Sequence, residues 1–144
     1  MIMTILASEN GSIIGIINPA DRVGTTTNGA AIDLAKFHQA MFILTVGNTD
    51  ATVDFKLQES AATSSGYTDI SGKAITTFSA TDDNKQAIIN LDSSEMGSLK
   101  RYVRGVITAG SGTACVVAML ALGFSPRFRP ATDEDLASVT QVVS

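Results

Sequence analysis

The sequence predicts an all-β protein, either an antiparallel β-sandwich or a jelly-roll-like fold. Between residues 31 and 124, apolar residues alternate with short or polar ones, which places one face of each predicted strand in a core. Clusters of glycine, asparagine, aspartate and serine separate these runs, and no long helical pattern interrupts them. Short strands joined by turns, without helices between them, are typical of sandwiches and jelly rolls.

The first 30 residues are rich in turn-forming residues, with short apolar patches at 2–6 and 13–17. One interpretation is an extended N-terminal arm, which at this length could span at most about 100 Å and reach a neighbouring subunit. The alternative is a first strand or two of the same domain. The apolar start lacks the positive region of a signal peptide and is broken at residues 9–11, so we do not expect export by that route.

Two hairpins are predicted in the central domain, residues 31–124. The first joins strands at 39–46 and 52–58 through the turn cluster GNTDA. The second joins strands at 99–109 and 113–124 around GSG. Its last strand is apolar almost throughout, as expected of a central strand covered on both faces.

Shorter elements lie between these hairpins. Ser71-Gly72 predicts a bulge or a break within the strand pattern, and Asp92-Ser93-Ser94-Glu95 predicts a single capped helical turn that ends at Gly97. The remaining predicted strands are a short edge strand at 31–35 and strands at 67–70, 73–78 and 86–91.

The last twenty residues, 125–144, predict a C-terminal tail that contains a short helix. The prolines of SPRFRP end the sheet because they cannot donate to a strand ladder. Thr132 is placed to cap the helix, and the acids after it suit a first turn. An isolated helix this short is marginal in water, so it needs its own domain or a neighbour to lie on. Its expected apolar face consists of Leu136, Val139 and Val143.

Composition restricts the kinds of partner. The chain has 144 residues, 44% of them hydrophobic, which is enough for one domain with one core. Its formal charge of −4 disfavours nucleic acid, because phosphate binding needs clustered positive charge. The longest apolar run, 114–124, is about half the length of a membrane-spanning helix, so no membrane is expected either. The single cysteine, Cys115, lies in an apolar run typical of a buried residue.

No catalytic, cofactor-binding or metal-binding residue is predicted. His38 is the one histidine, and it precedes a buried strand, where a surface or strand-end position is the expected role. Asp82-Asp83-Asn84 resembles a calcium-binding segment superficially but lacks the spaced donors and the closing glutamate. We therefore expect a protein without enzyme activity and without a cofactor.

Two surface features remain as candidates for protein contact. A basic strip of Lys100, Arg101 and Arg104 surrounds Tyr102, and it either faces an acidic partner or forms a solvated strand face. The second feature is the segment 127–129, where a phenylalanine is flanked by arginines between prolines. Such a segment is typical of an interface anchor, and the alternative is a proline-stiffened turn.

One long segment of the chain resembles a known family. It contains a strand of the form FxLxVG, the strand VDFKLQES, the segment YTDISGKAIT, the strand INL and a final stretch RYVRGVITAG followed by ACVVAMLALG. This layout, from AIDLAKF onward, is similar to that of the small cement or decoration proteins of tailed-bacteriophage capsids. The similarity covers about two thirds of the chain and leaves out residues 1–30 and 125–144.

The resemblance implies a structural virion protein that is made in the host cytoplasm. Such a protein binds the outer surface of the capsid as a homodimer or homotrimer and cements neighbouring copies of the major capsid protein. Alternatives are another virion part, such as a head completion or tail protein, and a carbohydrate-binding β-sandwich. The residues expected to contact the partner lie in the two end segments: Ile2, Ile5, Leu6, Ile13, Ile14, Ile16, Ile17, Arg127, Phe128, Arg129, Leu136, Val139 and Val143.

Overall fold

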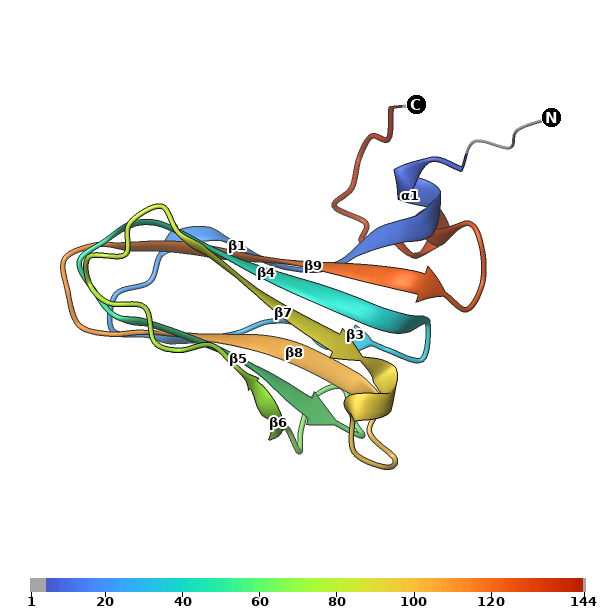
Figure 1. Ribbon diagram of the computed structural model, residues 1–144, viewed down its shortest axis with the longest axis horizontal. Helices are drawn as coiled ribbons and strands as arrows, with labels where there is room; N and C mark the ends of the chain where they lie inside the picture. Colours follow the sequence, from blue (N-terminus) through green and yellow to red (C-terminus); the bar gives the residue numbers. More distant parts are fainter. Residues whose placement is uncertain (1–4, 144) are drawn as a thin grey trace.

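The computed structural model describes residues 5–143 and shows two antiparallel sheets packed face to face (Figure 1). The predicted β-sandwich is therefore confirmed. The elements are α1 (Ala7–Asn10), β1 (Gly11–Asp21), β2 (Thr26–Asn28), β3 (Ile32–Asp33), β4 (Phe37–Thr49), β5 (Val53–Ser60), β6 (Thr68–Ala74), β7 (Gln86–Asp92), the 3₁₀ turn η1 (Ser93–Glu95), β8 (Tyr102–Ala109), β9 (Cys115–Pro126) and the 3₁₀ turn η2 (Ala131–Glu134).

The strand order is that of a jelly roll. One sheet has the order β1-β9-β4-β7 and the other β2-β8-β5-β6, with β3 also paired to β8. Four strand pairs are nested inside one another along the chain, from the innermost to the outermost: β5 with β6, β4 with β7, β2 with β8 and β1 with β9. A long hairpin wrapped into two layers produces this nesting, which is how an eight-stranded jelly roll is built.

The core lies between the two sheets and follows the predicted alternation. Phe42, Leu44 and Val46 of β4 point inward and are completely buried. Val53, Phe55 and Leu57 do the same from β5 in the facing sheet, with at most 1% of each side chain exposed. Because successive side chains in a strand point to opposite faces, these runs each give one buried face.

Both predicted hairpins are wrong in their pairing. β4 and β5 belong to different sheets, and so do β8 and β9. The short connections between them are arches that cross from one layer to the other at one end of the sandwich (Figure 1). The carboxylate of Asp50, in the first arch, accepts hydrogen bonds from the backbone N–H groups of Thr113 (2.7 Å) and Ala114 (2.9 Å) in the second. The two arches therefore stabilise each other.

The N-terminal residues from 11 onward form strands, so the interpretation of an arm over residues 1–30 is wrong for them. β1 pairs with β9 from Gly11 opposite Phe124 to Asp21 opposite Val116. β2 pairs with β8 in the other sheet. The alternative of first strands in the same domain is the correct one, and the sandwich therefore begins well before residue 31.

Two smaller predictions concern turns. The register between β5 and β6 shifts near the predicted bulge, and Gly72 there adopts φ +73°, which favours glycine. The predicted helical turn is η1, and its N-cap is Asp92, whose carboxylate accepts from the N–H of Ser94 at 2.9 Å.

The C-terminal helix is much shorter than predicted. It is the single 3₁₀ turn η2, and its N-cap is Pro130, not Thr132. The helix ends at Glu134 because the next residues bond to β1 instead of continuing it. Asp135 accepts a hydrogen bond from the N–H of Ile13 at 2.7 Å, and the N–H of Leu136 donates to the carbonyl of Ile13 at 2.9 Å. No continuous helical face therefore joins Leu136 to the 91%-exposed Val143.

Candidate interaction surfaces

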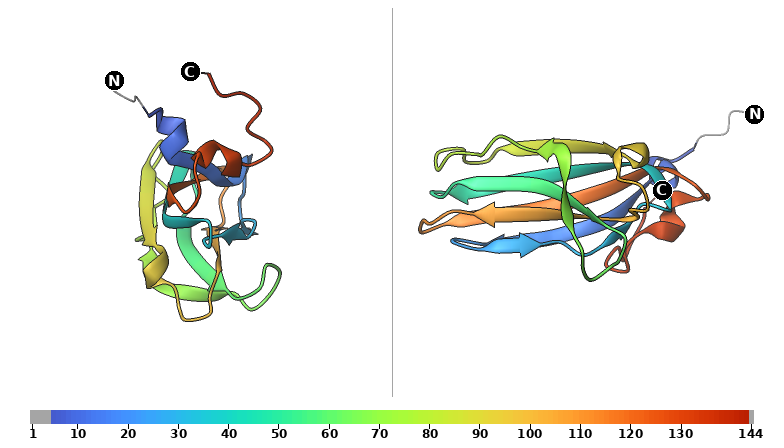
Figure 2. Two further views of the ribbon diagram at one scale, coloured as in Figure 1. Left: turned by 90° about the vertical axis from the view of Figure 1, so that its right-hand side faces the viewer. Right: turned by 90° about the horizontal axis from the view of Figure 1, so that it is seen from below.

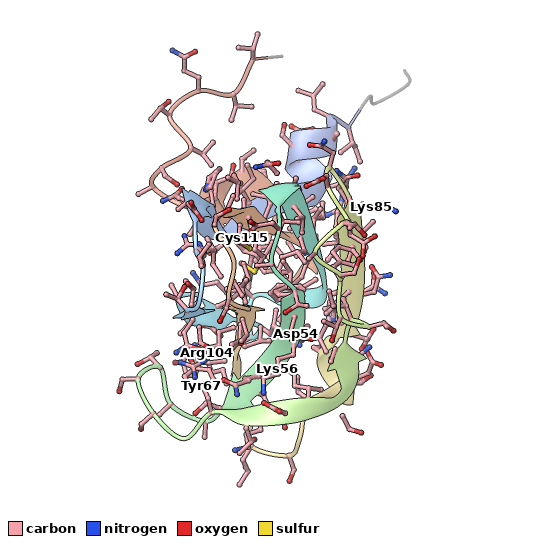
Figure 3. The ribbon with its side chains drawn as sticks, turned by 90° about the vertical axis from the view of Figure 1, so that its left-hand side faces the viewer. Asp54, Lys56, Tyr67, Lys85, Arg104 and Cys115 are labelled. Atoms are coloured by element: carbon pink, nitrogen blue, oxygen red, sulfur yellow. The ribbon has the colours of Figure 1, made fainter. Side chains whose placement is uncertain are left out.

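The residues considered for chemistry occupy ordinary structural positions. His38 is exposed on β4, as predicted, and Cys115 is completely buried in the core (Figure 3). The carboxylate of Asp83 accepts from the N–H of Thr49 at 2.7 Å, so this acid caps the backbone. Within residues 5–143, histidine, cysteine and carboxylate side chains form no group of three or more that could hold a metal ion. In the same part of the chain, no helix has the length and apolar character needed to cross a membrane.

The arginines of the predicted basic strip are engaged within the chain. Arg101 forms a two-pronged ion pair with Asp33, with N–O distances of 2.6 and 2.8 Å. Arg104 donates to the side-chain oxygen of Gln58 at 2.8 and 3.1 Å, and its guanidinium lies 4.0 Å from the ring centre of Tyr67 (Figure 3). The strip is therefore a strand face whose arginines are already paired, which favours the solvated alternative over contact with an acidic partner.

A polar network extends from Arg104 across the outer face of the second sheet. The side-chain amide of Gln58 donates to the carboxylate of Asp69 at 2.7 Å, and Lys56 forms an ion pair with the same carboxylate at 2.8 Å. The hydrogen bond from Lys56 is the main cause of the lowered pKa of Asp69. Burial raises the pKa of Tyr67, and the nearby charge of Arg104 opposes that rise. This face is thus polar and internally satisfied.

Acid should destabilise the fold in part through Asp33. The hydrogen bond from Arg101 holds the pKa of Asp33 below its usual value, against the opposing effect of burial. A folded-state pKa below the unfolded one stabilises the fold above the unfolded pKa, and this contribution disappears as pH falls through the folded pKa. We expect the free energy of unfolding to decrease below about pH 4. In urea unfolding at a series of pH values, Asp33→Asn should flatten part of that decrease. An unchanged pH profile would contradict the assignment.

The apolar end residues expected to contact a partner differ widely in their burial. Ile14 and Ile17 are 7% and 5% exposed and belong to the core of this domain, so their assignment to a partner surface is wrong. The cause is that β1 is part of the sandwich. Ile2 lies outside the described residues. Of the others, Ile5, Leu6, Ile16, Phe128 and Val143 are exposed, and Ile13, Leu136 and Val139 are half-buried.

Exposed residues of the two end segments lie next to α1 and η2, which contact each other at one end of the sandwich. We define the terminal patch as Ile5, Leu6, Arg127, Phe128 and Arg129. Ile5 and Arg129 line the same concavity of about 300 Å³, together with Glu9 and Pro130. Phe128 is 78% exposed, and Ile5 and Leu6 are 44% and 40% exposed. Both ends of the described chain lie at this end of the molecule (Figure 2).

Hydrogen bonds fix the base of the terminal patch. The N–H of Arg127 donates to the carbonyl of Lys36 at 2.9 Å, and Lys36 forms an ion pair with Glu134 at 2.6 Å. The buried hydroxyl of Ser12 donates to the carbonyl of Ala131, which is itself completely buried. The exposed side chains of the patch therefore stand on a backbone that is anchored to β1 and to the start of β4.

A second surface is only partly predicted by the sequence: the outer face of the four-stranded sheet, of which Ile13 and Ile16 are among the residues expected to contact a partner. Ile16, Leu120, Ile43 and Ile88 lie in register across β1, β9, β4 and β7, so they form one row over the whole sheet. The next row consists of Ile13, Leu122, Met41 and Asn90. We call these two rows the aliphatic face. The signal in the sequence was the apolar character of residues 114–124 on both faces, which predicted a covering layer.

The chain was compared with known proteins. No protein-family model matches it, and no curated protein matches its sequence. Among solved structures, one similar chain comes from work entitled "Bacillus endospore appendages form a novel family of disulfide-linked pili". The two chains share 12% sequence identity with a TM-score of 0.46, over 87% of this chain and 98% of the other. A likeness this distant says nothing about what the present chain does.

Proposed function

We propose that this chain is a structural protein without enzyme activity that binds the outer surface of a tailed-bacteriophage capsid. In this role it cements neighbouring copies of the major capsid protein on the exterior of the virion, after synthesis in the host cytoplasm. The observation that carries the proposal is the terminal patch, a set of exposed apolar and arginine side chains from the two end segments on a well-anchored backbone, of which Ile5 and Arg129 line one concavity. The family resemblance of the central strands supports the same role.

The chemistry of the terminal patch suits protein contact. Phe128 offers a large apolar surface that is now 78% exposed, and burying such a ring against a partner is favourable. Arg127 and Arg129 flank it, and arginines beside an aromatic ring are enriched in protein interfaces. Because the backbone below is held by Lys36, Ser12 and β1, little ordering is needed on binding.

Because a capsid repeats the same surface many times, weak contacts between each copy of this chain and the shell would be enough to hold it there. A capsid presents the same surface many times, and a cement protein that touches more than one subunit gains from effective concentration. Each contact can then be weak while the assembled shell is held firmly. The rigid jelly roll supplies a body that keeps the patch in one orientation on every copy.

Binding to shells tests the proposal through Phe128. Purified protein is mixed with empty shells assembled from the major capsid protein of the same phage genome, and co-sedimentation gives the stoichiometry and affinity. The native chain should bind at a fixed ratio to the capsid protein and raise the temperature at which shells break. Phe128→Asp should weaken binding by roughly 30-fold or more, because a buried aromatic anchor is replaced by a charge.

The control is Ser64→Asp, which adds the same charge at an exposed position of the loop between β5 and β6. This variant should bind shells as the native chain does. Saturable binding of the native chain that Phe128→Asp leaves intact would remove the terminal patch from the interface. Absence of binding to shells, with binding to isolated tails or to head completion complexes, would favour another virion part.

A carbohydrate-binding sandwich is the weaker candidate. Sugar sites commonly stack exposed aromatic rings on the ligand, and the chain has two tyrosines and no tryptophan. Tyr67 already has the guanidinium of Arg104 over its ring at 4.0 Å, and Arg101 lies 5.4 Å from the ring centre of Tyr102. Each tyrosine therefore has an arginine at its ring, which reduces the surface left for a sugar.

A further inference from the structure

We infer that the aliphatic face is the contact surface of a symmetric homodimer, in which two copies of this chain pack their four-stranded sheets against each other. The inference concerns self-association and does not depend on the identity of the larger partner in the proposed function. Three observations support it: two rows of side chains are almost entirely apolar, the sheet face that carries them is as large as a small interface, and a single self-complementary face suits a two-fold axis.

Seven of the eight side chains in the two rows are aliphatic. The central row contains four aliphatic side chains, and it ends in Ile16 and Ile88, which are 39% and 57% exposed. The second row is aliphatic in Ile13, Leu122 and Met41, and only Asn90 on β7 is polar. Along β9 the apolar surface continues to Val116, which is 38% exposed.

A β-bulge makes this face possible on β1. Ile13 pairs with Leu122 and Ile16 with Leu120, although they are three residues apart, because the register shifts between Ile13 and Gly15. Ile14 stays buried on the inner side of the same strand. At Gly15 a Cβ atom would lie 2.4 Å from the Cδ1 atom of Ile32, so the buried Ile32 would have to shift to admit a side chain there. The bulge thus turns two isoleucines outward.

The sheet face that carries the two rows has the size of a small dimer interface. Four strands are about 19 Å wide, and the stretch from Val116 to Phe124 is about 27 Å long, which gives roughly 500 Å² in projection, about half of it covered by the two apolar rows. The rows on either side are more polar, with Thr45 and Gln86 on one side and Gln39 and Asp92 on the other, so they form a rim around an apolar centre. Burying this sheet face on both copies removes roughly 1,000 Å² from water, which is the lower limit for a specific interface.

The symmetry favours a second copy with a two-fold axis. In a two-fold dimer the same patch meets itself, and an uncharged aliphatic surface is complementary to its own copy. A ring of three copies needs two different complementary patches on each chain, and one flat sheet face supplies one. Two sheets that pack face to face lie about 10 Å apart with their side chains interdigitated, as the two sheets within this chain already do. This favours the dimer among the two oligomers that the family resemblance implies.

Sedimentation of the full-length protein over a wide range of concentration tests the inference without any shell present. The native chain should sediment at twice the 15.0 kDa mass of one chain and dissociate on dilution. Ile88→Lys and Ile16→Lys place a charge at each end of the central row, and each should weaken dimerisation by roughly 30-fold or more. Both sites are already partly exposed, so the monomer should keep its native circular dichroism and melting temperature.

The matched control is Leu99→Lys, because Leu99 is 93% exposed but precedes β8 and lies off the aliphatic face. This variant should dimerise as the native chain does. A second measurement uses Ile43→Cys, near the centre of the face, which should give an intermolecular disulfide under mild oxidation, whereas Leu99→Cys should not. The native Cys115 is completely buried and should not interfere. A native chain that is monomeric at every concentration, a trimer, or a dimer unaffected by Ile88→Lys and Ile16→Lys would overturn the inference.

Failure here is distinguishable from failure of the proposed function. Phe128→Asp should leave the dimer intact, since Phe128 belongs to the terminal patch and not to the aliphatic face. Conversely, a monomeric native chain that still binds shells would reject the dimer and leave the capsid role standing. The two surfaces are therefore tested by separate variants and by separate measurements.

Discussion

Gly123→Ala should lower the free energy of unfolding by about 3 kcal/mol, a large effect for the addition of one methyl group. An added Cβ atom would lie 2.7–2.9 Å from three carbons of the Phe37 ring. That ring is 1% exposed and enclosed by the core, so it cannot move aside. Gly123 is therefore the point at which β9 makes room for the first side chain of β4.

The matched control is Gly47→Ala in the same sheet. At Gly47 an added Cβ atom meets Val116 at 3.5 Å, which is ordinary van der Waals contact. Alanine also reduces the conformational freedom of the unfolded chain, so this variant should be neutral or slightly stabilised, by about 0.5 kcal/mol. Urea unfolding measures both variants. A loss at Gly123 no larger than at Gly47 would mean that Phe37 yields, and the steric argument would then be wrong.

A double-mutant cycle identifies the cause of the loss at Gly123. If the clash with Phe37 is responsible, Phe37→Leu should cost less in the Gly123→Ala background than in the native chain, because the smaller side chain relieves the overlap. Additive losses would place the strain elsewhere. The cycle therefore separates a specific contact from a general intolerance of side chains on β9.

Much of the fold could be predicted from local patterns, and the pairing of strands could not. Alternation identified β4 and β5 and their buried residues, since the direction of a side chain is set by its own strand. Pairing depends on which strands meet in space. In a jelly roll, β5 pairs with β6 as a neighbour, but β4 pairs with β7 across two intervening strands, and β1 pairs with β9 across most of the chain. A short turn between two strands favoured a hairpin in each case, whereas the structure uses such turns as arches between layers.

The N-terminal isoleucines show a second limit of prediction from the sequence, because some are buried in the core and others face outward. The run SIIGII has neither strand nor helix periodicity, and all its isoleucines were assigned to a partner surface. The bulge at Gly15 shifts the phase, so Ile14 and Ile17 enter the core while Ile13 and Ile16 face outward. No local rule gives the position of a bulge without the partner strand. The exposed Phe128 between its arginines, in contrast, was visible from the sequence because it follows the proline that ends β9.

The apolar character of β9 was interpreted correctly as the mark of a central strand, but the cover on its second face is not supplied by the described chain. Leu120 and Leu122 point away from the core and are half-buried, and their neighbours Ile16 and Ile88 are exposed. A strand that is apolar on both faces in a two-layer sandwich has one face left to bury. The uncovered apolar face of β9 is the physical basis for the inferred dimer.

Removal of residues 1–17 should abolish cooperative folding. Such a deletion would leave the fold intact only if the segment were an arm, but the structure places most of β1 in it. The chain would lose Ile14 and Ile17 from the core, each contributing about 1.5–3 kcal/mol by burial. It would also lose the backbone pairing along one side of β9. These losses approach the whole stability of a typical domain, about 5–15 kcal/mol.

The comparison is a chain that lacks residues 138–144, because Val142 and Val143 in this segment are 53% and 91% exposed and the bonds from Asp135 and Leu136 to β1 remain. The chain without residues 138–144 should melt cooperatively, close to the native melting temperature. The chain that begins at residue 18 should show no sharp transition by circular dichroism and should be cleaved rapidly by protease. A sharp melt of the shorter N-terminal variant near the native temperature would show that β1 adds little to the core. If the variant is unfolded, as expected, its loss of shell binding would report on unfolding and not on contacts with a partner. Binding experiments on the N-terminal segment therefore need point substitutions at Ile5 and Leu6 instead of deletions.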